Sequence, residues 1–182
     1  MRSWNVAAIM VMAIAIGLLV CGCQSGTSGE SPAAEAFKID MQNTLKEITA
    51  ILIEPVSQAD QQAVNAVVDA FCVSLVTQTP PLVCGVAVLD KNGMTLVGRY
   101  PEEPLKTLNF SNYSVVKQAL RERKIVQGRL FLQDGTRLYT VVAPLSSEGE
   151  MHGLFGLAFT AAELTERWGI TEDEFMDLDL NR

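Results

Sequence analysis

Four cysteines and a single histidine are the first candidates in this sequence for a nucleophile or a transition-metal ligand. Cys21 and Cys23 stand one residue apart near the N-terminus, whereas Cys72, Cys84 and His152 are widely separated. A nucleophilic dyad or a metal site needs at least two such groups together, and His152 has no second histidine or cysteine near it in the sequence. The chain also contains no P-loop, no dinucleotide-binding glycine motif and no G-x-S-x-G. The sequence therefore predicts a protein that is not an enzyme and holds neither cofactor nor metal.

The two N-terminal cysteines follow an apolar segment of signal-peptide length. Residues Val6 to Val20 are apolar except for one glycine, and as a helix they would rise only about 22 Å, short of a hydrocarbon core of ~30 Å. A charged head and a short apolar run are typical of a secretory signal peptide. The boundary Val20-Cys21-Gly22-Cys23 resembles the lipobox of bacterial lipoproteins, in which a small residue precedes the modified cysteine. The resemblance implies cleavage after Gly22 and diacylation of Cys23; the alternative is an uncleaved anchor that begins at Trp4.

These features divide the chain into three parts. Residues 1–22 are predicted to be a lipoprotein signal peptide, residues 23–33 a lipidated cysteine with a Gly/Ser-rich flexible tether, and residues 34–182 a single domain. The predicted location is the cell envelope, lipid-anchored and facing the periplasm or cell exterior. Gln24 replaces the aspartate that tends to retain lipoproteins at an inner membrane, so the outer membrane is expected where two membranes are present.

Charge and the remaining cysteines add two further expectations. The formal net charge of −7 makes nucleic acid an unsuitable partner, because binding phosphates needs a basic surface. Cys72 and Cys84 remain after the signal peptide and the lipidated residue are set aside, and an even number in an oxidising compartment favours a disulfide. The alternative is a pair of free thiols, one on a helix and one on a strand.

The spacing of apolar residues predicts helices at both ends of the domain and a sheet between them. Apolar residues recur every three or four positions from Ala34 to Glu54, where Pro55 ends or kinks a first helix, and Ser57 is placed to cap a second. Five strands follow in two groups, interrupted by a helix that begins near Ser111, and capping-box patterns at Thr160 and Thr171 open terminal helices. The expected strands are Val83–Leu89, Met94–Arg99, Ile125–Leu132, Arg137–Leu145 and Met151–Phe159. Short turns join the strands within each group, so the prediction is an α+β domain with an antiparallel five-stranded sheet.

This order of elements, with the motifs it carries, resembles a Cache domain, the extracytoplasmic PAS-like sensor module. The resemblance rests on "GVAVLDKNGMTLV", "FSNYSVVKQALRERKIVQGRL" and "RLYTVVAPLSSEGEMHGLFGLAFTAAEL", and it covers roughly residues 64–164. Profilin-like domains such as roadblock share much of this topology and are the competing fold. Membership of the Cache family implies a small-molecule ligand, often a carboxylate or amino acid, held between the sheet and the loop and helix of Tyr100 to Leu120.

The resemblance also implies which side chains would hold such a ligand. A buried carboxylate needs a charged donor, best an arginine, and hydroxyl groups that orient it. The predicted ligand-binding residues are Arg99, Tyr113, Arg129, Arg137 and Tyr139. Amino-acid-binding relatives carry an "R-x-W-Y" run before the helix, which is absent here, so a small carboxylate-type metabolite is expected instead of an amino acid. The predicted function is a lipid-anchored sensor domain that signals through a partner protein; the alternative is a ligand-free scaffold for protein–protein interaction.

Overall fold

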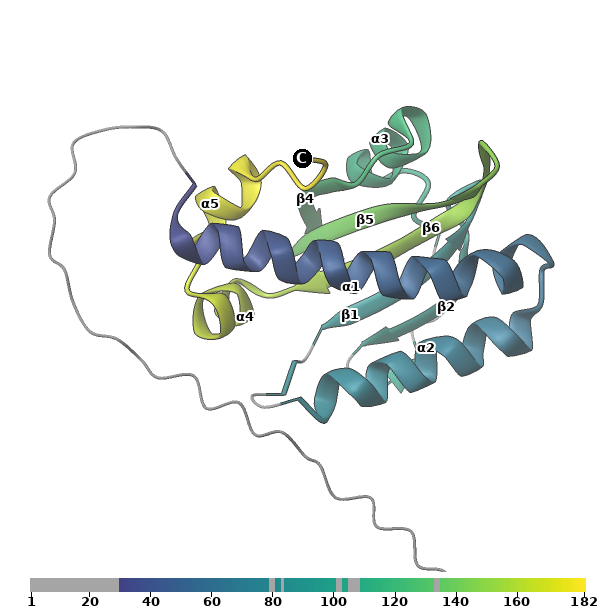
Figure 1. The fold of residues 1–182 in the computed structure, drawn as a ribbon, viewed down its shortest axis with the longest axis horizontal. Coiled ribbons are helices and arrows are strands. Elements are labelled where there is room, and N and C mark those ends of the chain that lie inside the picture. Colours follow the sequence, from purple (N-terminus) through teal and green to yellow (C-terminus); the bar gives the residue numbers. More distant parts are fainter. Residues whose placement is uncertain (1–29, 79–80, 83, 101–102, 105–108, 133–134) are drawn as a thin grey trace, which may run out of the picture.

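The computed structural model describes residues 30–78, 81–82, 84–100, 103–104, 109–132 and 135–182 (Figure 1). Cys23, the predicted signal peptide and most of the predicted tether lie outside these residues. Among the described helices, none combines the length and the apolar character needed to cross a bilayer.

Helix α1, Pro32–Ser57, presents the predicted apolar stripe to the sheet. It begins where the Ser31 side chain accepts a hydrogen bond from the backbone N–H of Ala34 at 3.1 Å and proline occupies the first helical position. Five residues of the stripe are at most 4% exposed: Phe37, Met41, Leu45, Ile48 and Leu52. Pro55 does not end the helix, which was one of the two predicted alternatives; it lies in the last turn and removes one donor, and the helix continues to Ser57.

Helix α2, Gln61–Val76, is capped by Asp60 and not by Ser57 as predicted. The Asp60 carboxylate accepts from the backbone N–H of Ala63 at 3.0 Å. Ser57 belongs to α1, where its hydroxyl donates to the Glu54 carbonyl oxygen at 2.8 Å. The chain therefore turns later than predicted, through Ala59, whose φ of 54° is left-handed.

The sheet confirms the predicted α+β class and the five predicted strands. These are β1 (Gly85–Asp90), β2 (Thr95–Tyr100), β4 (Val126–Phe131), β5 (Arg137–Ser147) and β6 (Glu150–Phe159). A two-residue strand, β3 (Glu103–Pro104), extends one edge, so the order is β3-β2-β1-β6-β5-β4 with every neighbouring pair antiparallel. The β1–β2 turn has the predicted Asn-Gly step: Asp90 accepts from the N–H of Asn92 and of Met94, and Gly93 has φ 79°.

The two faces of this sheet are covered differently. Helices α1 and α2 lie side by side over one face, and helix α3 (Ser114–Glu122) packs on the other near β4 and β5 (Figure 1). Two separate apolar clusters result. One joins α1 and α2 to the sheet through residues such as Phe37 and Phe155, and the other joins α3 to the sheet through residues such as Val115 and Leu154. Because successive strand residues point to opposite faces, β1, β5 and β6 each contribute alternately to the two clusters.

The C-terminal elements close the α1 side of the sheet. They are α4 (Ala161–Glu163), a π-helical turn (Leu164–Trp168) and α5 (Glu172–Asp177). Both predicted capping boxes are present, one between Thr160 and Glu163 and the other between Thr171 and Glu174. The indole N–H of Trp168 donates to the Asp40 carboxylate at 3.0 Å, which ties this end of the chain to α1.

Candidate ligand-binding site

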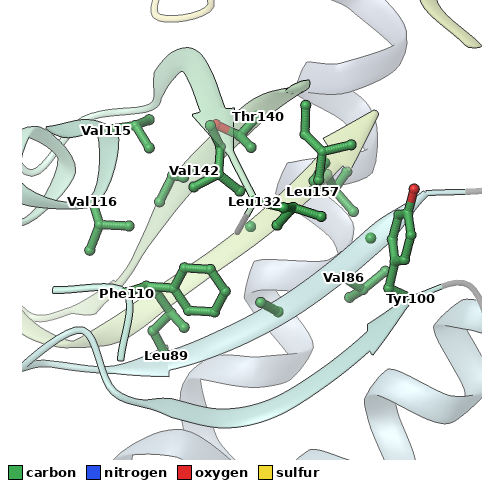
Figure 2. Close-up of a pocket in the computed structure, with 16 residues that line it drawn as sticks. Val86, Leu89, Tyr100, Phe110, Val115, Val116, Leu132, Thr140, Val142 and Leu157 are labelled. Carbon is green, nitrogen blue, oxygen red and sulfur yellow. The ribbon is translucent and has the colours of Figure 1, made fainter. Parts of the chain in front are cut away.

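A pocket of about 90 Å³ lies on the α3 face of the sheet (Figure 2). Strands β1, β4, β5 and β6 contribute to its lining, α3 adds Val115 and Val116, and the segment before α3 adds Phe110. The remaining lining residues are Gly85, Val86, Ala87, Leu89, Tyr100, Leu130, Leu132, Leu138, Thr140, Val142, Gly156, Leu157 and Ala158. The described residues do not enclose the pocket completely.

The hollow exists because two neighbouring residue pairs between β1 and β6 have only glycine or alanine at its floor. Ala87 of β1 pairs with Gly156 of β6, and Gly85 pairs with Ala158. A Cβ added at Gly156 would meet no atom closer than 3.9 Å, so a methyl group would fit at this point of the pocket floor without a clash. Larger side chains from α3 and the outer strands surround this floor as walls (Figure 2).

The described part of the pocket wall is apolar. Of the lining residues that the structure describes, Thr140 and Tyr100 alone have polar side chains, and none of these described residues carries a charge. Thr140 is 6% exposed, and its hydroxyl donates to the Gly128 carbonyl oxygen at 3.2 Å. The described wall therefore offers surface for apolar contact and very few groups that can donate a hydrogen bond.

Three of the predicted ligand-binding residues lie together, but on the face of the sheet opposite the pocket. Arg129, Arg137 and Tyr139 alternate with pocket residues such as Leu130 and Leu138 along β4 and β5, so they point toward α1 and α5. Both arginines meet carboxylates of α5. Arg137 pairs with Glu172 at 2.9 Å, and Arg129 lies 3.7 Å from Asp173.

Tyr139 is part of the core beneath this ion pair. It is fully buried, its ring packs edge-on against Phe175 at 5.6 Å, and the Arg137 guanidinium lies 5.7 Å from its ring centre. Its hydroxyl has no hydrogen-bond partner of acceptable geometry among the described atoms. Burial, followed by the proximity of the Glu172 carboxylate, raises the pKa of Tyr139 above its usual value. In this position the Tyr139 ring contributes to the packing of the core.

The other two predicted residues are placed separately. Arg99 bonds to residues of α2: its Nε donates to Asp69 at 2.9 Å and its Nη2 donates to Asn65 at 3.2 Å. Tyr113 precedes α3 and packs against the pocket residue Phe110 with ring centres 5.5 Å apart. Of the five predicted residues, Tyr113 alone belongs to the apolar cluster around the pocket, and it is not in the lining.

The residues that sequence reasoning missed are the small ones. Gly156 and Ala158 lie in "GLFGLAF", where they alternate with Phe155 and Leu157, and Ala87 lies in "GVAVLD". A glycine or alanine on one face of two strands that pair is the signal that could have located the cavity, once the pairing register was known.

Cys72 and Cys84 are both free thiols, which is the alternative left open by the sequence. Cys84 is buried and Cys72 is half-buried. Burial raises the pKa of each thiol above its ordinary value of 9.0, and the effect is the larger for Cys84. A thiol held protonated in this way is a weak nucleophile, so neither cysteine has the character of a catalytic group.

The raised pKa values predict a loss of stability in alkali. The folded state keeps the Cys84 proton while the unfolded state releases it above about pH 9, so the stabilisation is complete below pH 9 and declines as pH rises. In reductant, one such thiol should lower the free energy of unfolding by about 1.4 kcal/mol for each pH unit above 9. Urea unfolding at pH 8, 9 and 10 measures this slope, and Cys84→Ala should flatten it; an unchanged slope in the variant would contradict the assignment.

His152 makes one contact of interest, outside the pocket. Its Nε2 lies 2.8 Å from the hydroxyl of Ser147 across the β5–β6 hairpin. Within the described ranges, no group of three histidine, cysteine or acidic side chains is arranged to hold a metal ion.

Several solved structures have a fold similar to that of this chain. The extracellular domain of vpHK1S-Z8, a protein assigned as a histidine kinase, matches with a TM-score of 0.61 at 12% identity, over 78% of this chain and 57% of that chain. A domain of a sensory box/GGDEF family protein from Vibrio parahaemolyticus matches with a TM-score of 0.55 at 13% identity, over 78% and 61% of the two chains. The extracellular domain of mmHK1S-Z3, also assigned as a histidine kinase, matches with a TM-score of 0.55 at 16% identity, over 76% and 58%.

The chain adopts the fold of these three domains, an antiparallel sheet flanked by helices of the Cache-like, PAS-like type. This confirms the fold expected from the resemblance. The chain spans about three fifths of the length of these three structures, and identities this low establish the fold alone. No protein-family model and no curated protein sequence matches it.

Proposed function

We propose that this protein is an extracytoplasmic sensor domain that binds a small molecule in the pocket between the sheet and α3. The observation that carries the proposal is the unfilled apolar hollow over Gly156, because a domain without a ligand would normally fill such space with its own side chains. The fold shared with extracellular domains of proteins assigned as histidine kinases supports the location and the sensory role.

The carboxylate-type ligand expected from the sequence finds no cationic partner in the described part of the pocket wall. The three predicted arginines are engaged with Asp69, Asp173 and Glu172 outside it. The proposed function therefore keeps the small-molecule ligand and the pocket, and moves the site from the predicted residues to the lining described above.

A binding screen tests the proposal. Thermal unfolding of the full chain against carboxylates, amino acids, alcohols and small aromatic compounds should show a rise in midpoint with at least one class. A ligand at 100 times its dissociation constant adds about 2.7 kcal/mol to the free energy of unfolding, which for a domain of this size raises the midpoint by roughly 5–10 °C. A flat screen with protein that unfolds cooperatively would reject the sensor proposal.

We further propose that Cys23 is diacylated and that the lipid anchors the domain to the membrane. The sequence Gly22-Cys23 after a short apolar run supports this proposal. Cys23→Ser should leave an uncleaved precursor without lipid, whereas Cys21→Ser should be processed normally. Intact-mass analysis of the membrane fraction checks both variants; a wild-type chain that retains Met1 would contradict the anchor.

The signal, on this proposal, passes to a partner protein. The alternative function, a scaffold that binds proteins and no ligand, is favoured by large apolar side chains exposed on α1 and α2. These are Ile39, Ile51, Val73 and Val76, which are 44–60% exposed. The two functions are separated by the binding screen, because the scaffold requires that no small molecule stabilise the folded chain.

A further inference from the structure

We infer that the pocket selects an uncharged ligand with a short aliphatic or aromatic body, whose polar group, if it has one, is a hydrogen-bond donor such as a hydroxyl. This inference rests on the proposed function, since it specifies the chemical class that the same pocket would bind. It replaces the carboxylate expected from the sequence, and it follows from what the described walls can and cannot contact.

The absence of charge on the described walls is the first step. An anion that leaves water needs a cation or several hydrogen-bond donors in its place, and within the described ranges no lining residue is charged. The strands of the floor cannot supply backbone donors freely, because β1, β5 and β6 each pair with a strand on both sides. A carboxylate placed over Gly156 would therefore lose its hydration without an equivalent replacement.

The second step is the direction of the Thr140 hydroxyl. Its proton is directed to the Gly128 carbonyl oxygen at 3.2 Å, so toward the pocket the oxygen presents lone pairs. A lone pair attracts a donor and repels a carboxylate oxygen. Thr140 is 6% exposed, so its hydroxyl oxygen lies in surroundings of low polarity. In such surroundings a hydrogen bond from a ligand hydroxyl is strongest, and repulsion between this oxygen and a carboxylate is also strongest.

The third step is size. An engineered protein cavity of about 150 Å³ holds benzene, and in proportion the 90 Å³ of this pocket has room for roughly four carbon atoms inside the walls. A larger ligand would need to extend through the open side. The pocket therefore fits a short alkyl chain or the edge of an aromatic ring.

Among the described elements around the pocket, the start of α3 is an arrangement that could favour an anion. Its N-cap residue, Tyr113, provides no side-chain cap, and the first turn contains the lining residues Val115 and Val116. A helix N-terminus attracts negative charge. The two possibilities are separated by ligands that share a carbon skeleton and differ in charge.

The experiment compares 1-butanol with butyrate and benzyl alcohol with benzoate, titrated into the full chain while the methyl NMR signals of Val115, Leu138 and Val142 are followed. We expect both alcohols to shift these signals and to bind at least tenfold more tightly than the matched acids. Gly156→Val fills the floor and should abolish the shifts. Ala70→Val adds apolar volume on the exposed side of α2 and should leave them unchanged, which controls for nonspecific partitioning.

Thr140→Val separates the hydroxyl contact from apolar contact. The variant should bind 1-butanol severalfold more weakly than the wild type does. Its affinity for 1-chloropropane, which has no hydrogen-bond donor, should be unchanged. An unchanged affinity for 1-butanol would remove Thr140 from the inference.

The remaining outcomes test the ligand class separately from the pocket as a binding site. Acids that bind more tightly than alcohols and shift the same methyl signals would overturn the ligand class, implicate the start of α3 and leave the proposed function standing. No shift with any of the four compounds in folded protein would overturn both the ligand class and the pocket as a binding site.

Discussion

Replacing Gly153 by alanine should lower the free energy of unfolding by about 3 kcal/mol, a large effect for a change of one methyl group. Gly153 lies in β6, opposite Asp90 of β1 and Leu145 of β5. A Cβ at this position would overlap the carbonyl oxygen of Leu89 and lie 3.3 Å from Cγ1 of Val56. The obstructing atom is backbone in a strand paired on both sides, so a side-chain rotation cannot relieve the overlap and the strands must move apart.

Gly156→Ala is the matched control, three residues further along the same strand. Its added methyl group would meet nothing closer than 3.9 Å, and alanine reduces the conformational entropy of the unfolded chain. We expect this variant to be as stable as the wild type or up to about 1 kcal/mol more stable. Urea unfolding followed by circular dichroism measures both variants. Equal midpoints for the two would show that β1 and β6 are not packed as described here.

The contrast between these two glycines illustrates what the sequence can and cannot predict. Both occur in "HGLFG", and the pattern of the segment correctly predicts a strand. Gly153 lies against the carbonyl oxygen of Leu89, whereas Gly156 lies at the pocket floor. The register between β1 and β6 determines this difference. Register is a property of the pairing of segments about 65 residues apart, and local spacing does not determine it.

The helices, strands and capping boxes were predictable because local signals determine them. Apolar periodicity identified α1, and Thr160 and Thr171 begin their helices with the predicted side-chain contacts. The errors occurred where two local signals compete. Pro55 predicts an end or a kink of α1, but a single missing donor in a last turn costs too little to stop a helix whose preceding stripe is buried.

The predicted ligand-binding residues do not line the described pocket, for a different physical reason. Strand alternation correctly separated Arg137 and Tyr139 from Leu138 and Thr140, but alternation does not reveal which set faces a cavity. The chemistry of arginine predicts a carboxylate partner, but the acidic residues that pair with these three arginines lie 30 to 44 positions away in the sequence, where local patterns do not reveal them. The pocket is instead defined by missing side chains, which a search for functional groups does not detect.

Phe37→Ala should lower the free energy of unfolding by about 4 kcal/mol. Phe37 is fully buried where α1 meets the C-terminal elements. Its ring packs edge-on against three others, at 5.0 Å from Trp168, 5.7 Å from Phe175 and 6.3 Å from Phe159. Truncation leaves a cavity among rings that cannot collapse into it, and it removes contacts between α1 and the segments that follow β6.

Phe131→Ala provides the control for the same substitution at an exposed position. Phe131 is 59% exposed on β4, so its replacement should change the free energy of unfolding by no more than about 0.5 kcal/mol. Urea unfolding of both variants tests the contrast, and a loss below about 1 kcal/mol for Phe37→Ala would contradict its place at the centre of this cluster.

The position of Phe37 also bears on how a bound ligand could be reported. The pocket lies on the opposite face of the sheet, so Phe37→Ala removes no residue that lines it. Well below its unfolding midpoint, the variant should bind the same alcohols with unchanged affinity. Helix α1 follows the segment proposed to carry the lipid, and Phe37 joins it to β6, whose Gly156 forms the pocket floor. If Phe37→Ala binds the alcohols normally but no longer transmits a signal to the partner protein, the contact between β6 and α1 is needed for that transmission.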